Sequence, residues 1–343
     1  MNASYGLGRD RGVNALEGQT IAVLGYGRQG RAHALNLRES GARVLIGLRP
    51  EGASRKLALE DGFGSSLHSV AEVVREADLV CFLLPDMVQP SLYLEEVASN
   101  LREDAALLFA HGLSIHYRMI VPSGNHDVIL VAPKGPGALV RRQFQEGKGV
   151  PCLIAVHQNT SGKAKEKAHH YAHMIGGTRA GILETSFKEE TETDLFGEQA
   201  VLCGGATELV KAGFETLVAA GYQPELAYFE CMHELKLIVD LLYEGGLTKM
   251  HEFISDTAKY GTLESGTRVI DKHVRQNMQE ILNEIQDGRF AARWKKEYDN
   301  GLANYRNALS RELHHPIEEI GRGLRSQMSW LQKQAGGDEH DRS

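Results

Sequence analysis

The fold of this chain is decided by residues 20–30, which read TIAVLGYGRQG. The apolar run 20–24 is rich in β-branched residues, as is typical of a parallel strand that is buried on both faces. Three glycines follow with the spacing Gly-x-Gly-x-x-Gly; residues 31–41 then predict a helix that ends at glycine, and residues 44–48 predict a second strand. Because this signature stands between a strand and a helix, it predicts a dinucleotide-binding site in an α/β domain.

The three glycines have separate roles in such a turn. Gly25 makes the tight bend, Gly27 lets the backbone approach a pyrophosphate, and Gly30 lets the helix pack closely against the strand. The pyrophosphate would lie at the N-terminus of the helix, where unpaired N–H groups and the helix dipole favour an anion.

The loop after the second predicted strand indicates which dinucleotide is bound. Residues 48–55 read LRPEGASR, and Arg49 stands where an NAD enzyme usually carries an acidic residue. Arg49 and Ser54 can bind the 2′-phosphate of NADP, whereas Glu51 could instead bond the ribose diol of NAD. The sequence therefore favours NADP and leaves the use of NADH open.

Composition excludes several other classes of protein. Of the 343 residues, 42% are hydrophobic and 24% are charged, as in a globular protein with room for two domains. The net charge of −7 argues against nucleic acid as the main partner. No apolar run approaches the ~20 residues of a membrane helix, and the first residues do not resemble a targeting peptide. The scattered cysteines predict buried free thiols in a reducing cytoplasm: Cys81, Cys152, Cys203 and Cys231.

Strand and helix signals continue to alternate along the first half of the chain. A helix is predicted at 71–77, and strands are predicted at 79–84, 105–110, 127–132 and 151–156. Ligands of open α/β sheets collect beyond the carboxyl ends of the strands. His111 and Lys134 directly follow two of these strands, so they are candidate functional residues, with an ordinary surface-loop position as the alternative.

The pattern changes to helical periodicity near residue 187. We therefore expect a Rossmann-like NADP-binding domain over residues 1–186, an all-helical domain over 187–334, and a polar tail over 335–343. Within the first domain, Lys163, Lys165 and Lys167 are expected on a solvent-exposed helix face.

Two pairs of acidic residues stand out in the helical half. Asp194 and Glu198 are four residues apart, and so are Glu230 and Glu234, so each pair leaves one face of a helix. Like charges at this spacing repel each other unless they point into water or share a cation. If the two pairs converge, four carboxylates would suit Mg²⁺, which prefers oxygen ligands. Solvated helix faces are the alternative.

Together these motifs resemble those of the ketol-acid reductoisomerase family of branched-chain amino-acid synthesis, over nearly the whole chain. The resemblance rests on residues 25–30 (GYGRQG), 36–41 (NLRESG), 111–116 (HGLSIH), 132–137 (APKGPG), 189–199 (EETETDLFGEQ), 229–236 (FECMHELK) and 254–258 (ISDTA). The length is similar to that of the short bacterial form. The resemblance implies a cytoplasmic bacterial or archaeal enzyme with a knotted helical domain. It also implies a homodimer whose second subunit completes the active site, with larger assemblies left open.

The resemblance assigns roles to the acidic pairs and to other residues. Asp194 would bridge two Mg²⁺ ions and Glu198 would hold one of them, while Glu230 and Glu234 would hold the other from the partner chain. Ser255 would bond the substrate carboxylate. The NADP site would be lined by Gly25, Tyr26, Gly27, Arg28, Gln29, Gly30, Arg49, Ser54, Asp86, Met87, Val88, Gln89 and Gly137.

The resemblance also bears on catalysis and on the choice of cofactor. His111 is the family's active-site residue, and Lys134 would lie beside the metals. Proton transfer would fall to a carboxylate, Glu198 or Glu230, or to a metal-bound water that Lys134 or His111 positions. Where many relatives carry a serine in the 2′-phosphate loop, this chain has Gly52, which removes one phosphate ligand and keeps the preference between NADPH and NADH open.

The implied reaction has two steps on 2-acetolactate and its ethyl homologue, 2-aceto-2-hydroxybutyrate. An alkyl group first migrates between adjacent carbons with the help of two Mg²⁺ ions, and a nicotinamide hydride then reduces the resulting ketone to a 2,3-dihydroxy acid. These are the steps of valine and isoleucine synthesis. Two alternatives remain: a metal-free β-hydroxyacid dehydrogenase that uses NADP, and a cofactor-sensing or scaffold protein whose helical half only dimerises.

Overall fold

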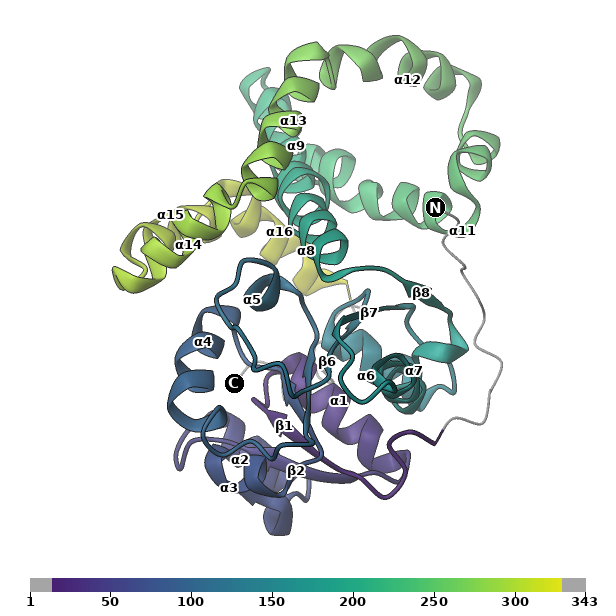
Figure 1. Cartoon of the computed structure of the whole chain (residues 1–343). Helices are drawn as coiled ribbons and strands as arrows, with labels where there is room; N and C mark the ends of the chain where they lie inside the picture. The colour runs from purple at the N-terminus through teal and green to yellow at the C-terminus, as the bar shows by residue number, and fades with distance from the viewer. Residues whose placement is uncertain (1–13, 329–343) are drawn as a thin grey trace. The chain divides into compact units, whose positions relative to one another are not determined.

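The computed structural model describes residues 14–328 (Figure 1). The predicted polar tail at 335–343 lies outside the described residues. The chain divides into two compact units, with the division between Thr191 and Glu192 inside helix α8 (Phe187–Gly197). The domain boundary that the sequence predicts, between residues 186 and 187, stays a prediction, as does the knot.

The first unit is built on an eight-stranded sheet. Its strands are β1 (Thr20–Leu24), β2 (Arg43–Gly47), β3 (Leu67–His68), β4 (Leu79–Phe82), β5 (Ala106–Phe109), β6 (Val128–Pro133), β7 (Cys152–Gln158) and β8 (Ile182–Glu184). Their spatial order is β3-β2-β1-β4-β5-β6-β7-β8. All neighbouring pairs are parallel except β6 and β7, which are antiparallel. The order reverses between β1 and β4, which is where ligands bind in doubly wound sheets.

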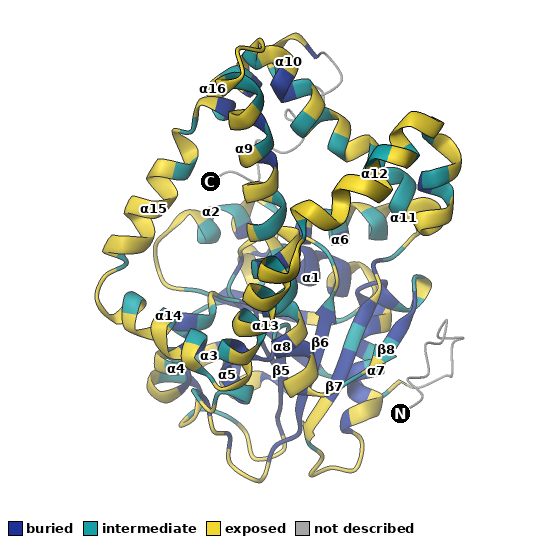
Figure 2. Cartoon of the chain, turned by 90° about the horizontal axis from the view of Figure 1, so that it is seen from above, coloured by how far each residue is buried: buried dark blue, intermediate teal, exposed yellow. Residues whose placement is uncertain are grey.

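Helices cover both faces of this sheet, so its strands are buried on both sides (Figure 2). In β1, Ile21 and Val23 face one hydrophobic core, and Ala22 and Leu24 face the other. One face is covered by α1 (Arg28–Glu39), α2 (Ala53–Glu60) and α7 (Ala164–Met174), and the other by α3 (Val70–Glu76), α4 (Gln89–Leu92), the π-helical turn η3 (Tyr93–Val97) and α5 (Leu113–His116). The continuous apolar strands of the sequence are explained by this three-layer arrangement.

The second unit is helical over its described residues. It consists of the end of α8, the π-helical turn η5 (Glu198–Leu202), α9 (Gly204–Ala219), α10 (Pro224–Tyr228), the π-helical turn η6 (Phe229–His233), α11 (Glu234–Phe253), α12 (Asp256–Val269), α13 (Lys272–Gln286), α14 (Arg289–Asp299), α15 (Ala303–Leu313) and α16 (Pro316–Gln327). Its core contains Val210, Phe214, Ala227, Tyr228 and Ile317. No helix in the described range 14–328 is long and apolar enough to span a membrane.

Two sequence expectations about the side chains are wrong in part. The cysteines were expected to be buried, but only Cys81 and Cys152 are; Cys203 is exposed and Cys231 is half-buried, although all four are free thiols. Lys167 was expected on a solvated face, yet it is buried, because the face of α7 on which it lies packs against the sheet.

Lys167 pairs with Asp127, the residue just before β6. Lys167 Nζ lies 2.8 Å from Asp127 Oδ2, and Ser161 donates from its main-chain N–H to Asp127 Oδ1 at 2.9 Å. Burial alone would raise the pKa of Asp127, but the bonds from Lys167 and Ser161 outweigh it and lower the pKa. The carboxylate is therefore stabilised in its charged form and ties α7 to the beginning of β6.

We expect Asp127→Asn to reduce the free energy of unfolding by about 3 kcal/mol at pH 7, because it leaves the buried Lys167 ammonium without its counter-charge. The folded pKa of Asp127 is depressed, so its contribution is present above the unfolded pKa of ~3.9 and is lost as the pH falls through the folded value. Urea unfolding at several pH values measures this: the difference between wild type and variant should shrink below about pH 4.

The matched control for Asp127→Asn is Glu184→Gln. Glu184 pairs with Lys165 at 2.7 Å, but both side chains are about half exposed, at 43% and 58%. Such a pair contributes less than ~1 kcal/mol. Equal losses in the two variants would contradict the importance of the buried pair.

Candidate active site

The glycine turn after β1 has the geometry that its sequence predicts. Gly25 has a φ of 96°, in the left-handed region that favours glycine, and a Cβ there would lie 2.8 Å from Leu83 O at the end of β4. A Cβ at Gly30 would collide with Gly25 O, whereas one at Gly27 would meet no atom of the described chain within 4 Å. The turn therefore has no room for a side chain at Gly25 or Gly30, whereas the space beside Gly27 is open. A pyrophosphate would approach the backbone at Gly27.

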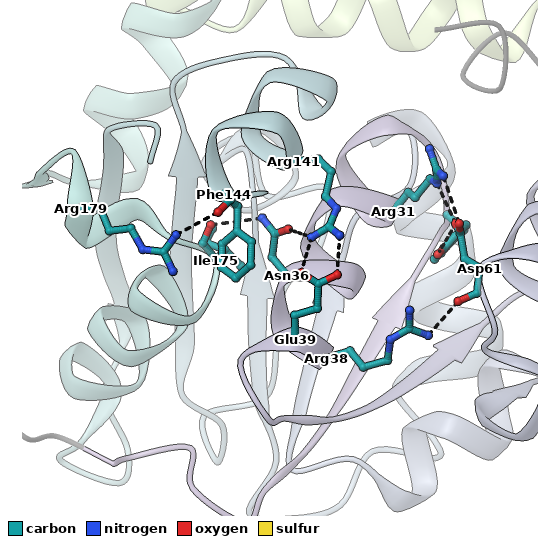
Figure 3. A network of polar contacts seen from close by, with 10 residues as sticks. Arg31, Asn36, Arg38, Glu39, Asp61, Arg141, Phe144, Ile175 and Arg179 are labelled. Atoms are coloured by element: carbon teal, nitrogen blue, oxygen red, sulfur yellow. Dashed lines mark hydrogen bonds and ion pairs between the residues drawn. The ribbon is translucent and has the colours of Figure 1, made fainter. Parts of the chain in front are cut away.

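Tyr26 follows the first glycine, but its side chain turns into the domain. It is only 2% exposed, and its hydroxyl donates to Asp61 Oδ2 at 2.9 Å. Arg31 binds the same carboxylate with two N–H groups, at 2.7 and 3.0 Å, and Arg38 donates to Asp61 O at 2.8 Å (Figure 3). Only the main chain of Tyr26 can therefore face a ligand. The bonds from Arg31 and Arg38 also hold α1 against Asp61, the residue directly after α2.

The loop that ends at Gly137 is fixed against the same glycine turn. Gln29 donates from Nε2 to Gly135 O at 2.9 Å, and a Cβ at Gly137 would collide with Arg28 O. The end of α1 is also held, because Arg141 of α6 (Gly137–Gln145) donates to Asn36 Oδ1 at 2.8 Å and pairs with Glu39 (Figure 3). The loops after β1 and β6 therefore pack directly against each other and are held together by this hydrogen bond.

The predicted 2′-phosphate loop lies between β2 and α2. Arg49 is exposed just beyond the carboxyl end of β2, and Ser54 lies half-buried in the first turn of α2. Gly52 has a φ of 131°, where a residue with a side chain is strained. A serine at this position would therefore require a different backbone conformation of the loop.

The turn at Asp86–Val88 follows β4, at the point where the strand order reverses. Gln89, which was expected to contact the cofactor, is only 4% exposed. Its Nε2 donates to Leu84 O at 3.0 Å, and its Oε1 accepts from Ser114 Oγ at 2.8 Å. The side chain of Gln89 therefore braces the loop from inside, and Met87 is buried as well.

His111, Lys134 and Glu190 meet beyond the carboxyl ends of β5 and β6. Glu190 is 1% exposed, and its Oε2 accepts from Gly112 N at 2.9 Å. His111 Nδ1 lies 3.2 Å from Glu190 Oε1, and Lys134 Nζ lies 3.9 Å from the same oxygen. The buried carboxylate of Glu190 thus contacts both His111 and Lys134, the two residues that the sequence predicts to be functional. The groups around this carboxylate are hydrogen-bond donors or carry positive charge.

Sequence reasoning missed Glu190, which it treated only as part of a longer motif. The available signal was its spacing: Glu190 lies one helical turn before Asp194 on α8, so the two carboxylates leave the same face. Gly112 explains how the loop reaches the helix, because a Cβ there would collide with Thr191 Oγ1 and lie 2.9 Å from Phe187 O.

The predicted metal ligands lie in or next to two π-helical turns of the second unit, except Asp194, which lies four residues before the first turn. Asp194 is half-buried in α8 and Glu198 is exposed at the first residue of η5; Glu230 is exposed within η6 and Glu234 is exposed at the first residue of α11. Four carboxylates in two i, i+4 pairs are a suitable donor set for Mg²⁺. Among the described residues of one chain, no cluster of three or more ligating side chains includes Glu230 or Glu234.

Ser255, the predicted substrate ligand, begins α12 as its N-cap. Its Oγ accepts from Ala258 N at 3.2 Å and can still donate its proton. The N-terminus of a helix also favours a carboxylate group.

These features define a class: a dinucleotide-binding oxidoreductase of the Rossmann type, with an acid–histidine–lysine cluster at the carboxyl ends of β5 and β6 and a helical unit rich in paired carboxylates. Residues 15–181 match the family described as acetohydroxy acid isomeroreductase, NADPH-binding domain, and residues 187–330 match the family described as ketol-acid reductoisomerase, C-terminal domain. The chain belongs to the ketol-acid reductoisomerase family.

Individual relatives agree with this assignment. The chain is 59% identical over 314 residues to a ketol-acid reductoisomerase (NADP(+)) of Xanthomonas axonopodis pv. citri, covering 92% of this chain and 94% of the relative. A namesake from Xylella fastidiosa is 57% identical over 318 residues, with coverages of 93% and 90%. A solved NADH-preferring ketol-acid reductoisomerase from an uncultured archean has a TM-score of 0.90 and 43% identity, and covers 95% of this chain and 99% of its own.

The resemblance seen in the sequence is therefore confirmed, as are the α/β plus helical fold class and the assignment to an enzyme. The comparisons support the reductoisomerase function rather than the metal-free dehydrogenase. The individual site residues stay predictions.

Proposed function

We propose that this protein converts 2-acetolactate to 2,3-dihydroxyisovalerate, and its ethyl homologue to the corresponding dihydroxy acid, with NADPH and two Mg²⁺ ions. The observation that carries the proposal is the buried Glu190, which holds His111 and Lys134 at the carboxyl edge of the sheet and lies one turn from Asp194. The glycine turn would hold the pyrophosphate of NADPH.

The first step moves the methyl group of acetolactate from C2 to C3. The C2 hydroxyl loses its proton as a C2 ketone forms, and the C3 oxygen becomes a hydroxyl. When bound, the Mg²⁺ ions would supply positive charge where negative charge shifts between these oxygens. Asp194 and Glu198 would hold them, together with the partner subunit's Glu230 and Glu234.

The residues of the first unit would handle orientation and protons. Glu190 fixes the direction of the His111 ring and keeps the Lys134 ammonium at the same place, so either residue can hold a proton beside the substrate oxygens. Ser255 would donate to the substrate carboxylate. When bound, NADPH would supply hydride to the C2 ketone, and a proton on the C2 oxygen completes the diol.

Both the cofactor preference and the assembly belong to this proposal. Arg49 and Ser54 support NADPH, while Glu51 and Gly52 keep NADH as a slower alternative. A homodimer is supported by large apolar side chains that α11 and α12 expose, among them Leu247 at 69%, Phe253 at 68% and Leu263 at 73%.

The test is a spectrophotometric assay of NADPH oxidation on 2-acetolactate. We expect turnover with Mg²⁺ and a loss of at least 100-fold when the protein is stripped with chelator, with recovery when Mg²⁺ is restored. The same assay with NADH measures the cofactor preference. Full activity of the stripped protein would reject the metal-dependent reaction and favour the metal-free dehydrogenase.

A further inference from the structure

Each pair of acidic residues in the helical unit adjoins a π-helical turn. Such turns add one residue to a helix and are rare, but they are frequent at functional sites. In η5, Cys203 donates its N–H to Glu198 O, five residues back, at 3.1 Å. In η6, Glu234 donates its N–H to Phe229 O with the same five-residue spacing.

Each turn lies between at least one carboxylate of its pair and the core residues that anchor the helices. Asp194 and Glu198 lie at the N-terminal side of η5, and on its other side α9 places Val210 and Phe214 in the hydrophobic core. At η6 the core residues come first along the chain: α10 places Ala227 and Tyr228 in the same core, Glu230 lies within the turn, and Glu234 directly follows it.

The added residue changes where the carboxylates point. In an α-helix, one residue corresponds to a rotation of ~100° and a rise of ~1.5 Å. Removing the π-turn would therefore rotate Asp194 and Glu198 by about a quarter of a turn relative to Val210 and Phe214. Since metal ligands must be placed within a few tenths of an ångström, such a rotation would dismantle the site.

Glycines in the sequence make room for both turns. A Cβ at Gly204 would collide with Gln199 O, and one at Gly205 would collide with Ala200 O, in each case the carbonyl five residues back. At the second turn, a Cβ at Gly213 of α9 would lie 3.0 Å from Cys231 Sγ of η6. One helix, α9, thus begins at the first π-turn and packs against the second.

We propose that the two π-helical turns aim the carboxylate pairs at their shared cations, and that Gly204, Gly205 and Gly213 are positioning residues for the metal site. This inference rests on the proposed function, because it takes Asp194 and Glu198 as ligands. The glycines contact no ligand themselves; they act by permitting the turn.

The experiment measures Mn²⁺ binding to the full-length protein by the loss of the free-ion electron paramagnetic resonance signal. In Gly205→Ala we expect Mn²⁺ affinity to fall at least tenfold, while NADPH binding to the other unit is unchanged. The matched control is Gly266→Ala in α12, where a Cβ meets no atom within 4 Å of the described chain, and its Mn²⁺ affinity should stay within twofold of wild type.

A second variant keeps the inference testable if Gly205→Ala unfolds. Deleting Val201, which is 51% exposed in η5, together with Gly205→Ala removes both the clash and the π-turn. This double variant should regain the thermal stability of wild type but still bind Mn²⁺ at least tenfold more weakly. Mn²⁺ binding that recovers together with stability would overturn the inference.

Asp194→Asn separates this inference from the proposed function. If it binds Mn²⁺ as wild type does, the metal role of Asp194 is wrong and the inference is overturned with it. If it loses Mn²⁺ affinity while the folded glycine variants keep theirs, the proposed function stands and the π-turns are not positioning devices.

Discussion

Asp194→Asn should reduce turnover of 2-acetolactate by about 10³-fold, equivalent to ~4 kcal/mol of transition-state stabilisation. Asparagine keeps the size of the side chain but removes the charge that a shared pair of cations requires. The first step should suffer most, because negative charge moves between two oxygens during alkyl migration. The measurement is paired: the full reaction on acetolactate, and the reduction alone on supplied 3-hydroxy-3-methyl-2-oxobutanoate.

The control for this variant is Asp299→Asn in α14, where the carboxylate is about half exposed and pairs with Lys295 at 2.6 Å. This exposed pair should have no effect on either half-reaction. Unchanged isomerisation in Asp194→Asn would show that Asp194 does not hold a bridging metal. Equal loss in both half-reactions would place the metal in the reduction as well, and a loss confined to reduction would contradict the role assigned here.

The dinucleotide turn could be predicted because its signal is local. Gly25 and Gly30 are required by a backbone conformation and by a close approach within a few residues, and the observed positive φ and the blocked Cβ positions agree with that reasoning. Six of the eight strands could be predicted in the same way, since short apolar runs bounded by glycine and polar residues mark buried strands. The two short strands at the edges of the sheet, β3 and β8, were not predicted, because runs of two or three residues carry too little pattern.

Other features depend on contacts between distant segments, which spacing along the chain does not reveal. Lys167 is buried because Asp127, 40 residues away, neutralises it. Gln89 braces a loop because Ser114 supplies the donor. Glu190 reaches His111 only when the carboxyl end of β5 and helix α8 are brought together. These side chains look like ordinary surface residues until the fold is known.

The two π-helical turns were also not predicted from the sequence, for a different reason. The i, i+4 spacing of the acidic residues was interpreted on a regular α-helix, which does not give the direction of the side chains relative to the core when a π-helical turn intervenes. The glycines at 204 and 205 were the only local sign of the added residue, and their meaning depends on carbonyl groups five residues back. A periodic pattern is insensitive to one extra residue in a single turn.

Glu190→Gln should lower kcat by about 10²-fold, or ~2.7 kcal/mol, while leaving NADPH binding nearly unchanged. The amide can keep one oxygen for Gly112 N, but it then places an NH₂ group where Oε1 accepts from His111 and attracts Lys134. A donor replaces an acceptor, and the negative charge disappears, so both residues lose the contact that orients them. Steady-state kinetics should show this as a fall in kcat rather than a rise in KM.

The adjacent carboxylate provides the control that makes this result interpretable. Glu189 is exposed and accepts from Thr185 Oγ1 at 2.8 Å, so Glu189→Gln makes the same chemical change one residue away and should leave kcat within about twofold. If Glu190→Gln only lowered the melting temperature and kept its kcat, Glu190 would be a structural anchor for the loop at Gly112. A lower kcat at unchanged melting temperature would instead mean that the buried carboxylate acts on the reaction through His111 and Lys134.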